Sequence, residues 1–174
     1  MNPWLVAAVA VALVLWARKG AAVAARRGDP MFDYAVQTAQ AAGVDPAVFL
    51  GIIEVESAWK PNATNLVGPD GARGGAFGLT QMTLRTARAL RPGITGDELL
   101  DWKTNLDVAG QLLAENARRI SPLWPDVAAA WNSGRSFDTA PEVTRYDYVP
   151  KVLKAANRYA TNLSLDLGDA EGEV

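Results

Sequence analysis

The sequence predicts a mainly helical fold. Helix-start and helix-stop residues recur along residues 29–163, and the apolar residues between them follow the 3.6-residue period of helices packed on a core. No stretch shows the sustained alternation of apolar and polar residues that is typical of a half-buried strand. A chain of 174 residues can bury one hydrophobic core and still carry short extensions at its ends.

Several of the expected helices have recognisable ends. Asp29 and Asp45 each precede a proline, so that the aspartate caps the helix and the proline takes its first position. Thr95 and Glu98 have the spacing of a capping box, in which each residue satisfies a backbone amide of the other. The segments expected to form helices are, in order, 29–43, 45–61, 83–93, 95–102, 104–119, 125–134 and 148–163.

The composition limits the chemistry. The chain contains no cysteine and no histidine, which excludes disulfides, thiolate nucleophiles, Ser-His-Asp triads and the common zinc sites. Acid–base chemistry near neutral pH is therefore left to carboxylates, lysines or tyrosines. With 17 Lys and Arg against 19 Asp and Glu, the chain lacks the basic surplus of a nucleic-acid-binding domain, so we expect no nucleic-acid partner. No metal or cofactor motif is visible.

The N-terminal segment predicts a membrane anchor. Residues 4–16 contain no polar side chain and have a tryptophan at each end, and an alanine-rich continuation lengthens the apolar stretch to residues 4–25. A cleaved signal peptide would carry its positive charge before the apolar run, whereas here Arg18 and Lys19 follow it. A buried core helix is the other alternative, but the run has no polar face.

These features divide the chain into three parts. We expect an N-terminal membrane anchor and basic linker at residues 1–28, a folded domain at 29–163 and an acidic flexible tail at 164–174. The basic residues follow the anchor, so the positive-inside rule places the folded domain on the cytoplasmic side.

Two glutamates interrupt the apolar stretch GIIEVESAWKP. On a helix, Glu56 lies on the same face as Phe49, Ile52 and Ile53, whereas Glu54 lies roughly 160° away and is expected to be exposed. A carboxyl that is half-buried among apolar groups has a raised pKa and can act as a general acid near neutral pH. The alternative for Glu56 is a structural role, paired with an arginine or capping the next loop.

Five motifs in order resemble one family. The segments VESAWKPNA, GAFGLTQMTLRTA, TNLDVAGQLL, AAWNSG and TRYDYVPKVL are similar to the motifs of the lytic transglycosylases of the soluble (SLT) type, relatives of goose-type lysozyme. The last one resembles the family's closing T-x-x-Y-V-x-x-V. Together they cover about residues 44–155. The resemblance implies a lysozyme-like helical domain that acts on peptidoglycan glycan strands.

The resemblance also implies roles for individual residues. It makes Glu56 the catalytic acid and base, Asn132 a substrate contact near the cleaved bond, and Tyr148 the residue that orients Glu56. The remaining residues that it places at the cleft, as lining or positioning groups, are Ser57, Gly78, Leu79, Thr80 and Gln81. The glycine-rich stretch GPDGARGGAFG, which alone reads as a flexible turn, then becomes a wall of the cleft.

The implied reaction needs one carboxylate. Glu56 protonates the oxygen of the β-1,4 bond between N-acetylmuramic acid and N-acetylglucosamine, then accepts the proton of the muramic C6 hydroxyl as a 1,6-anhydro ring closes. Asp70 is expected to be a turn residue in Pro-Asp-Gly. If it instead approached the cleft, it would supply a second carboxylate and make the protein a hydrolytic muramidase.

Two further alternatives do not involve catalysis. One is a wall-binding protein that keeps the fold and its cleft, and the other is a membrane-anchored adaptor that binds a partner through a large exposed apolar face. The anchor and the implied substrate together suggest a bacterial envelope or a bacteriophage virion, with a role in phage entry, lysis or envelope remodelling. The charge after the anchor is at odds with a standing periplasmic enzyme.

Overall fold

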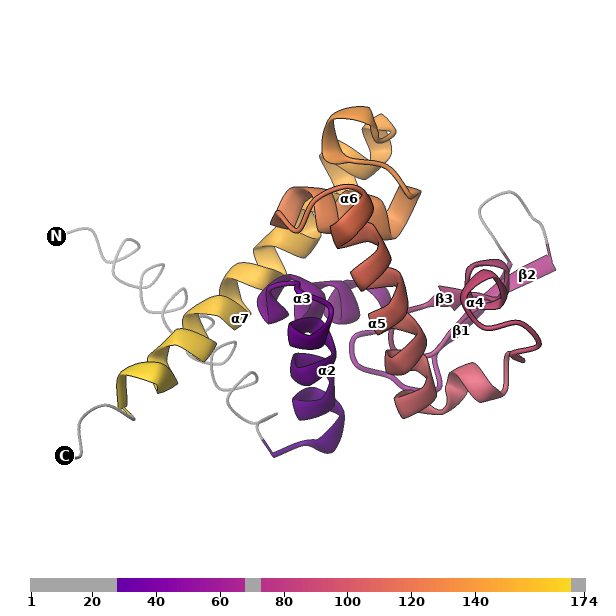
Figure 1. Ribbon diagram of the computed structural model, residues 1–174, viewed down its shortest axis with the longest axis horizontal. Helices are drawn as coiled ribbons and strands as arrows, with labels where there is room; N and C mark the ends of the chain where they lie inside the picture. The colour runs from indigo at the N-terminus through magenta and orange to yellow at the C-terminus, as the bar shows by residue number, and fades with distance from the viewer. Residues whose placement is uncertain (1–27, 68–72, 170–174) are drawn as a thin grey trace, which may run out of the picture.

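The computed structural model describes residues 28–67 and 73–169 of the chain. Helices make up most of this part, and a small sheet lies at one side of them, as Figure 1 shows. The mainly helical class predicted from the sequence is therefore confirmed. The helices are α2 (Pro30–Ala41), α3 (Pro46–Ser57), α4 (Leu84–Leu90), α5 (Trp102–Arg119), α6 (Trp124–Ser133) and α7 (Val149–Asp169), with the 3₁₀ turns η1 (Glu98–Leu100) and η2 (Phe137–Thr139) and the π-helical turn η3 (Thr144–Tyr148).

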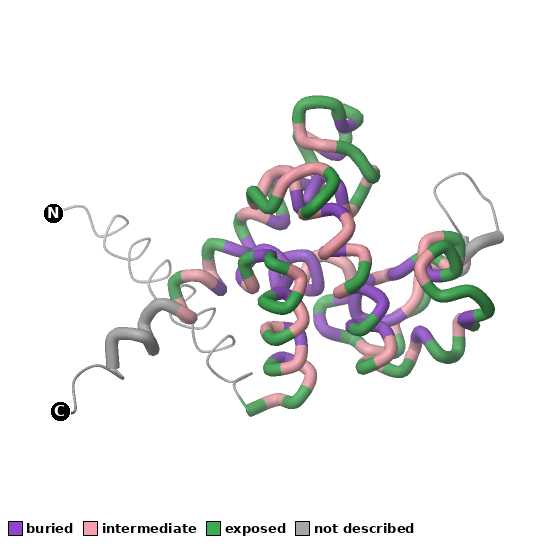
Figure 2. Tube along the Cα trace, viewed as in Figure 1, coloured by how far each residue is buried: buried purple, intermediate pink, exposed green. Residues whose placement is uncertain are grey.

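The core is centred on α3. All of its residues from Ala47 to Ile53 are buried, and α2, α6 and α7 pack around it (Figure 2). A helix that is apolar on all sides is stable only where other elements cover it on all sides. Its C-terminal turn, which carries both glutamates, emerges from this cover, because Glu54, Val55 and Glu56 are only partly buried. The buried helix thus delivers the two carboxylates to the edge of the core.

Gly51 allows α3 and α7 to lie in close contact. A Cβ at this position would lie 2.8 Å from the carbonyl oxygen of Val152 and 2.9 Å from the amide nitrogen of Ala156, both backbone atoms of α7. Alanine favours a helix over glycine by about 1 kcal/mol, but backbone atoms cannot rotate away from the added methyl group. We expect Gly51→Ala to lower the free energy of unfolding by about 1–3 kcal/mol, measured by urea denaturation; an unchanged value would show that α7 shifts freely.

The sheet was not anticipated by the sequence pattern. Strands β1 (Thr64–Val67), β2 (Arg73–Phe77) and β3 (Met82–Thr83) form an antiparallel sheet in the order β1-β2-β3. The strands have 4, 5 and 2 residues, and the register shifts between Asn65 and Val67. Strands this short, with a bulge and glycines, show no alternation. The glycine-rich stretch contributes β2, while residues 68–72, including Asp70, lie outside the described residues.

The predicted caps are present. The carboxylates of Asp29 and Asp45 accept hydrogen bonds from the amides two residues ahead, each at 2.9 Å. The capping box also forms: Glu98 accepts from the Thr95 amide at 2.9 Å, and the Thr95 hydroxyl accepts from the Glu98 amide at 3.2 Å. The box begins only the short turn η1, since a separate helix starts after Asp101, whose carboxylate accepts from the Thr104 amide at 2.8 Å.

The ends of the chain differ from the expected division in one respect. Helix α7 continues to Asp169, so residues 164–169 extend the helix instead of belonging to the acidic tail. The physical reason is that helix growth costs little once a helix exists, and no proline stops it there. The rest of the expected tail and the predicted anchor at residues 4–25 lie outside the described residues. In the part that is described, no helix has the length and apolar character needed to cross a bilayer.

Candidate active site

Glu56 lies in the last turn of α3, where the chain turns sharply. The two residues that follow the helix, Ala58 and Trp59, have φ angles of 51° and 66°, in the left-handed region that non-glycine residues rarely adopt. The indole nitrogen of Trp59 donates to the buried hydroxyl of Tyr159 on α7 at 2.9 Å, and its ring stacks on Phe32. This anchoring compensates for the backbone strain. Helix α3 therefore ends one residue after Glu56, earlier than the expected stop at Pro61.

The Glu56 carboxyl is half-buried and bonded to a tyrosine. The hydroxyl of Tyr148 donates to Glu56 Oε1 at 2.6 Å, although the two residues are 92 positions apart. Burial raises the pKa of the Glu56 carboxyl above its ordinary value, and the hydrogen bond from Tyr148 lowers it in part. Burial also raises the pKa of Tyr148 well above its ordinary value, and the neighbouring carboxylate adds to the rise. A protonated Glu56 beside a neutral tyrosine is the arrangement that a general acid needs.

Glu54 has the structural role that the sequence left open for Glu56. Its side chain forms an ion pair with Arg158 on α7 and is 34% exposed, so the residue expected to be exposed is partly buried instead. The helical periodicity placed it correctly away from Glu56 but carried no information about α7. The two glutamates therefore have different roles. Glu54 joins α3 to α7, whereas Glu56 forms no ion pair with a basic residue in the part of the chain that the structure describes.

The residues from Gly78 to Gln81 form a tight turn between β2 and β3. Gly78 has a φ of 74°, and a Cβ there would lie 2.4 Å from the carbonyl oxygen of Leu99, so only glycine fits. The side chains of Leu79 and Thr80 are completely buried. Of the residues that the resemblance places along the cleft, these two therefore lie inside the turn and expose neither side chain nor backbone.

Asn105 holds this turn from behind. Its Oδ1 accepts from the amide of Thr80 at 3.1 Å and from its hydroxyl at 2.8 Å. Its Nδ2 donates to the carbonyl oxygens of Phe77 at 2.9 Å and Leu99 at 3.0 Å. A fully buried asparagine that satisfies four groups fixes the turn to α5. Asn105 lies within the motif TNLDVAGQLL, but the motif alone did not indicate its role; a polar residue at a core position was the available signal.

Gln81 and Ser57 bond to nearby backbone. Gln81 has a φ of 47°, and its side-chain amide donates to the carbonyl oxygens of Ala63 at 3.1 Å and Gly78 at 3.0 Å. This anchors the turn to the segment that follows α3. The Ser57 hydroxyl is buried and donates to the carbonyl of Ile53 in its own helix at 3.2 Å. This bond supports the end of α3 and does not reach the Glu56 carboxyl.

The turn η3 contains one of the last two predicted residues, Tyr148, and bonds to the other, Asn132. Asn132 is exposed on the last turn of α6, and its Oδ1 accepts from the hydroxyl of Thr144 at 2.6 Å. Tyr148, at the other end of η3, reaches Glu56. Three residues separate Thr144 from Tyr148, and the segment that joins them is a π-helical turn. Sequence reasoning missed Thr144 because its role comes from a tertiary contact with α6.

Comparison with protein families matches residues 33–150 to the transglycosylase SLT domain. The match covers well over half of the chain and includes every candidate site residue. The chain belongs to this family. The family resemblance inferred from the motifs is confirmed, and membership supports peptidoglycan lytic transglycosylase activity and peptidoglycan binding in general. Comparison with the curated proteins found no match to the chain.

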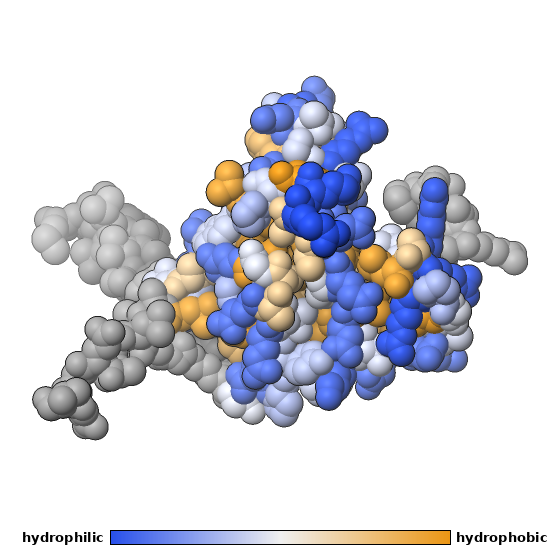
Figure 3. Space-filling view, viewed as in Figure 1, coloured by the Kyte–Doolittle hydropathy of each residue, from blue (hydrophilic) through white to orange (hydrophobic). Residues whose placement is uncertain are grey.

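Among the described residues, no group of three or more aspartates or glutamates lies close enough to hold a metal ion. The face seen in Figure 3 is mostly hydrophilic, and its apolar residues appear as separate spots. This face therefore lacks the broad apolar surface that an adaptor protein would need.

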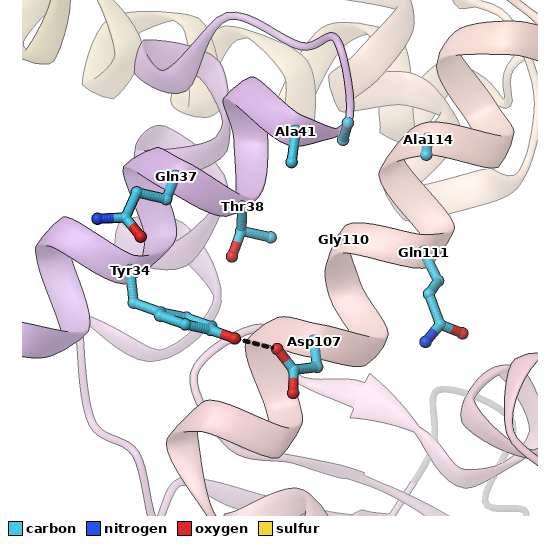
Figure 4. Close-up of a pocket in the computed structure, with 9 residues that line it drawn as sticks. Tyr34, Gln37, Thr38, Ala41, Asp107, Gly110, Gln111 and Ala114 are labelled. Atoms are coloured by element: carbon cyan, nitrogen blue, oxygen red, sulfur yellow. Dashed lines mark hydrogen bonds between the residues drawn. The ribbon is translucent and has the colours of Figure 1, made fainter.

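A hollow of about 420 Å³ lies between α2 and α5, away from Glu56. Figure 4 shows the ring of Tyr34 spanning the gap, with its hydroxyl donating to Asp107 at 2.5 Å. The ring also contacts Trp102 edge to face and carries Lys103 over it. Gln37, Gln111 and several small residues form the rest of the lining, and Gly110 lets the helices approach closely. These contacts account for the hollow as packing between two helices.

Replacing Tyr148 with phenylalanine should change the pH dependence of the SLT domain. The variant loses the hydrogen bond that lowers the pKa of Glu56, so this pKa rises further and the acid form persists to higher pH. We expect the alkaline limb of kcat/KM against pH to move to higher pH, with a maximal rate about tenfold lower. Tyr146→Phe on the same turn is the matched control, since Tyr146 is 70% exposed. An alkaline limb that stays in place would contradict the assignment.

Proposed function

We propose that the protein cleaves the β-1,4 bond between N-acetylmuramic acid and N-acetylglucosamine without water, with Glu56 acting as acid and then as base. The observation that carries this proposal is the half-buried Glu56 carboxyl, with its raised pKa and its hydrogen bond from Tyr148 at 2.6 Å. Burial favours the neutral acid that the first step needs, and the tyrosine hydroxyl stabilises the carboxylate that the step leaves behind.

In the first step the proton of Glu56 moves to the bridging oxygen as the bond from this oxygen to muramic C1 breaks. The positive charge that develops at C1 is that of an oxocarbenium-like transition state, and the substrate's own N-acetyl group assists where other glycosidases use a second carboxylate. The Glu56 carboxylate then accepts the proton of the C6 hydroxyl, and O6 bonds to C1. The proton lost in the first step is recovered in the second, so the enzyme returns to its starting state.

The residues around Glu56 support the same scheme. The turn Gly78–Gln81 is fixed by Asn105 and by the bonds of Gln81, so it forms a rigid support whose partly exposed residue is Gln81. Asn132 offers an exposed amide on α6. We propose that these residues hold the sugars on either side of the cleaved bond.

Product analysis tests the proposal. The full chain is incubated with purified peptidoglycan, and the soluble fragments are identified by mass spectrometry, with Glu56→Gln as control. Fragments that end in 1,6-anhydromuramic acid, one water lighter than reducing ends and absent with the variant, are expected. Reducing ends would instead establish a hydrolytic muramidase and make Asp70 the candidate second carboxylate. No release by the parent protein, with binding retained, would establish a non-catalytic wall-binding protein.

We also propose that residues 4–25 anchor the enzyme to a membrane in a bacterial envelope or a phage virion, for phage entry, lysis or envelope remodelling. The support is the apolar run of residues 4–16, which no polar residue interrupts and which has a tryptophan at each end. Fusion of alkaline phosphatase after residue 28 reports the side of the membrane. Activity of the fusion would place the domain outside the cytoplasm, and its absence would exclude a standing periplasmic enzyme.

A further inference from the structure

Thr144 is a buried hydroxyl that holds an exposed amide. Its residue is 2% exposed, and its Oγ1 donates to Asn132 Oδ1 at 2.6 Å. Within helical segments a threonine hydroxyl commonly bonds to a carbonyl of its own helix, as Thr161 does with Asn157 at 2.9 Å. Thr144 instead reaches across to α6. Its hydroxyl is therefore used to fix a side chain on a neighbouring element.

This bond determines which end of the Asn132 amide is available to a ligand. A hydroxyl has one proton, and here it is donated to the amide oxygen. The two polar atoms of an amide point in different directions, so the NH₂ group is turned away from Thr144. Since Asn132 is exposed, this donor end is accessible from outside. The site thus offers N–H donors to a ligand, and the group opposite must be an acceptor.

The same turn also fixes the acid. The amide of Val149 donates to the carbonyl of Thr144 and closes the π-helical turn, and Tyr148 from this turn donates to Glu56 at 2.6 Å. Two side chains of η3 therefore hold two different groups of the site: Thr144 holds the Asn132 amide and Tyr148 holds the Glu56 carboxyl. The π-helical turn sets the spacing between these contacts.

We propose that Thr144 is a positioning residue that turns the N–H donors of Asn132 toward the glycan, and that these donors bind an acceptor of the sugar, such as the carbonyl of an N-acetyl group. The proposal rests on the proposed function, because it takes the ligand to be an N-acetylated glycan. It names the chemistry of one contact and the residue that orients it.

A binding experiment separates the proposal from the cleavage reaction. The probe is the tetramer of β-1,4-linked N-acetylglucosamine, and its affinity is measured by calorimetry on the full chain carrying Glu56→Gln. We expect Thr144→Val to weaken binding about tenfold, the effect of one lost positioned hydrogen bond, and Thr144→Ser to restore most of it. In an Asn132→Ala background, Thr144→Val should have no further effect on the affinity.

Asn132→Asp tests the direction of the contact. This variant keeps an oxygen for Thr144 but replaces the donor end with a second acceptor, so binding should fall at least as far as with Asn132→Ala. Retained binding by Asn132→Asp would overturn the proposal, because the glycan would then supply the donor. A Thr144→Val effect that is equal in both backgrounds would also overturn it, since a purely structural role predicts that result. Failure of the parent protein to release fragments, with tetramer binding intact, would count against the proposed function alone.

Discussion

Glu56→Gln is expected to lower the rate of glycan cleavage by about 10² to 10⁴-fold, the range over which a positioned general acid and base contributes. Glutamine keeps the size of the side chain and can accept the hydrogen bond from Tyr148, but it cannot donate or accept the transferred proton. The measurement is the release of soluble fragments from purified peptidoglycan by the full chain. The protein should remain folded, which circular dichroism and thermal unfolding check.

Glu54→Gln is the matched control for this variant. It makes the same chemical change two positions away on the same helix, where the carboxylate pairs with Arg158. A partly exposed ion pair contributes little to stability, so a loss of at most about 1 kcal/mol and nearly unchanged cleavage are expected. Equal loss of activity in both variants would mean that the end of α3, and not the Glu56 proton, is what the reaction requires.

The stabilities of Glu56→Gln and of the parent protein should also diverge as the pH rises. The pKa of Glu56 is raised in the folded state, so the folded state binds more protons than the unfolded chain between the two pKa values. This contribution to stability is fully present below the unfolded pKa, near 4.5, and is lost as the pH rises through the folded pKa. Glutamine does not titrate. Melting temperatures of Glu56→Gln relative to the parent should therefore increase with pH across this range, and a constant difference would contradict burial of the acid.

The parts of the fold that depend on neighbouring residues were predictable from the sequence. The Asp-Pro starts and the capping box act over a few positions, and their hydrogen bonds form as expected. The inward direction of Glu56 followed from the helical period. The sheet was not predictable, because its strands are short and its register shifts, and their pairing depends on contacts between segments.

The site was predictable only through its motifs. Nothing in the spacing of Glu56 and Tyr148 indicates that side chains 92 positions apart share a hydrogen bond; the family resemblance supplied the pair. Asn105 and Thr144 escaped notice because their importance comes from tertiary contacts. A buried polar residue shows its role only when the groups it satisfies are known, and those groups lie on β2, η1 and α6.

Asn105→Leu is expected to cause the largest loss of stability among single changes at the candidate site. Leucine has a similar volume, but it leaves four groups without partners: the Thr80 amide and hydroxyl, and the carbonyl oxygens of Phe77 and Leu99. Each buried polar group left unsatisfied costs about 1–3 kcal/mol, and relaxation of the turn recovers part of the sum, so a loss of about 3–5 kcal/mol is expected.

Urea denaturation of the full chain measures this loss, with Gln111→Leu on the exposed side of α5 as the control expected to change stability by less than about 0.5 kcal/mol. Because the four released groups hold the Gly78–Gln81 turn, cleavage should fall even at temperatures where the variant is folded. A loss below about 1 kcal/mol would mean that water replaces the asparagine, and the turn would then not need Asn105 for its shape. A large loss of stability combined with full activity of the folded molecules would instead mean that Asn105 stabilises the turn but that cleavage does not depend on its bonds.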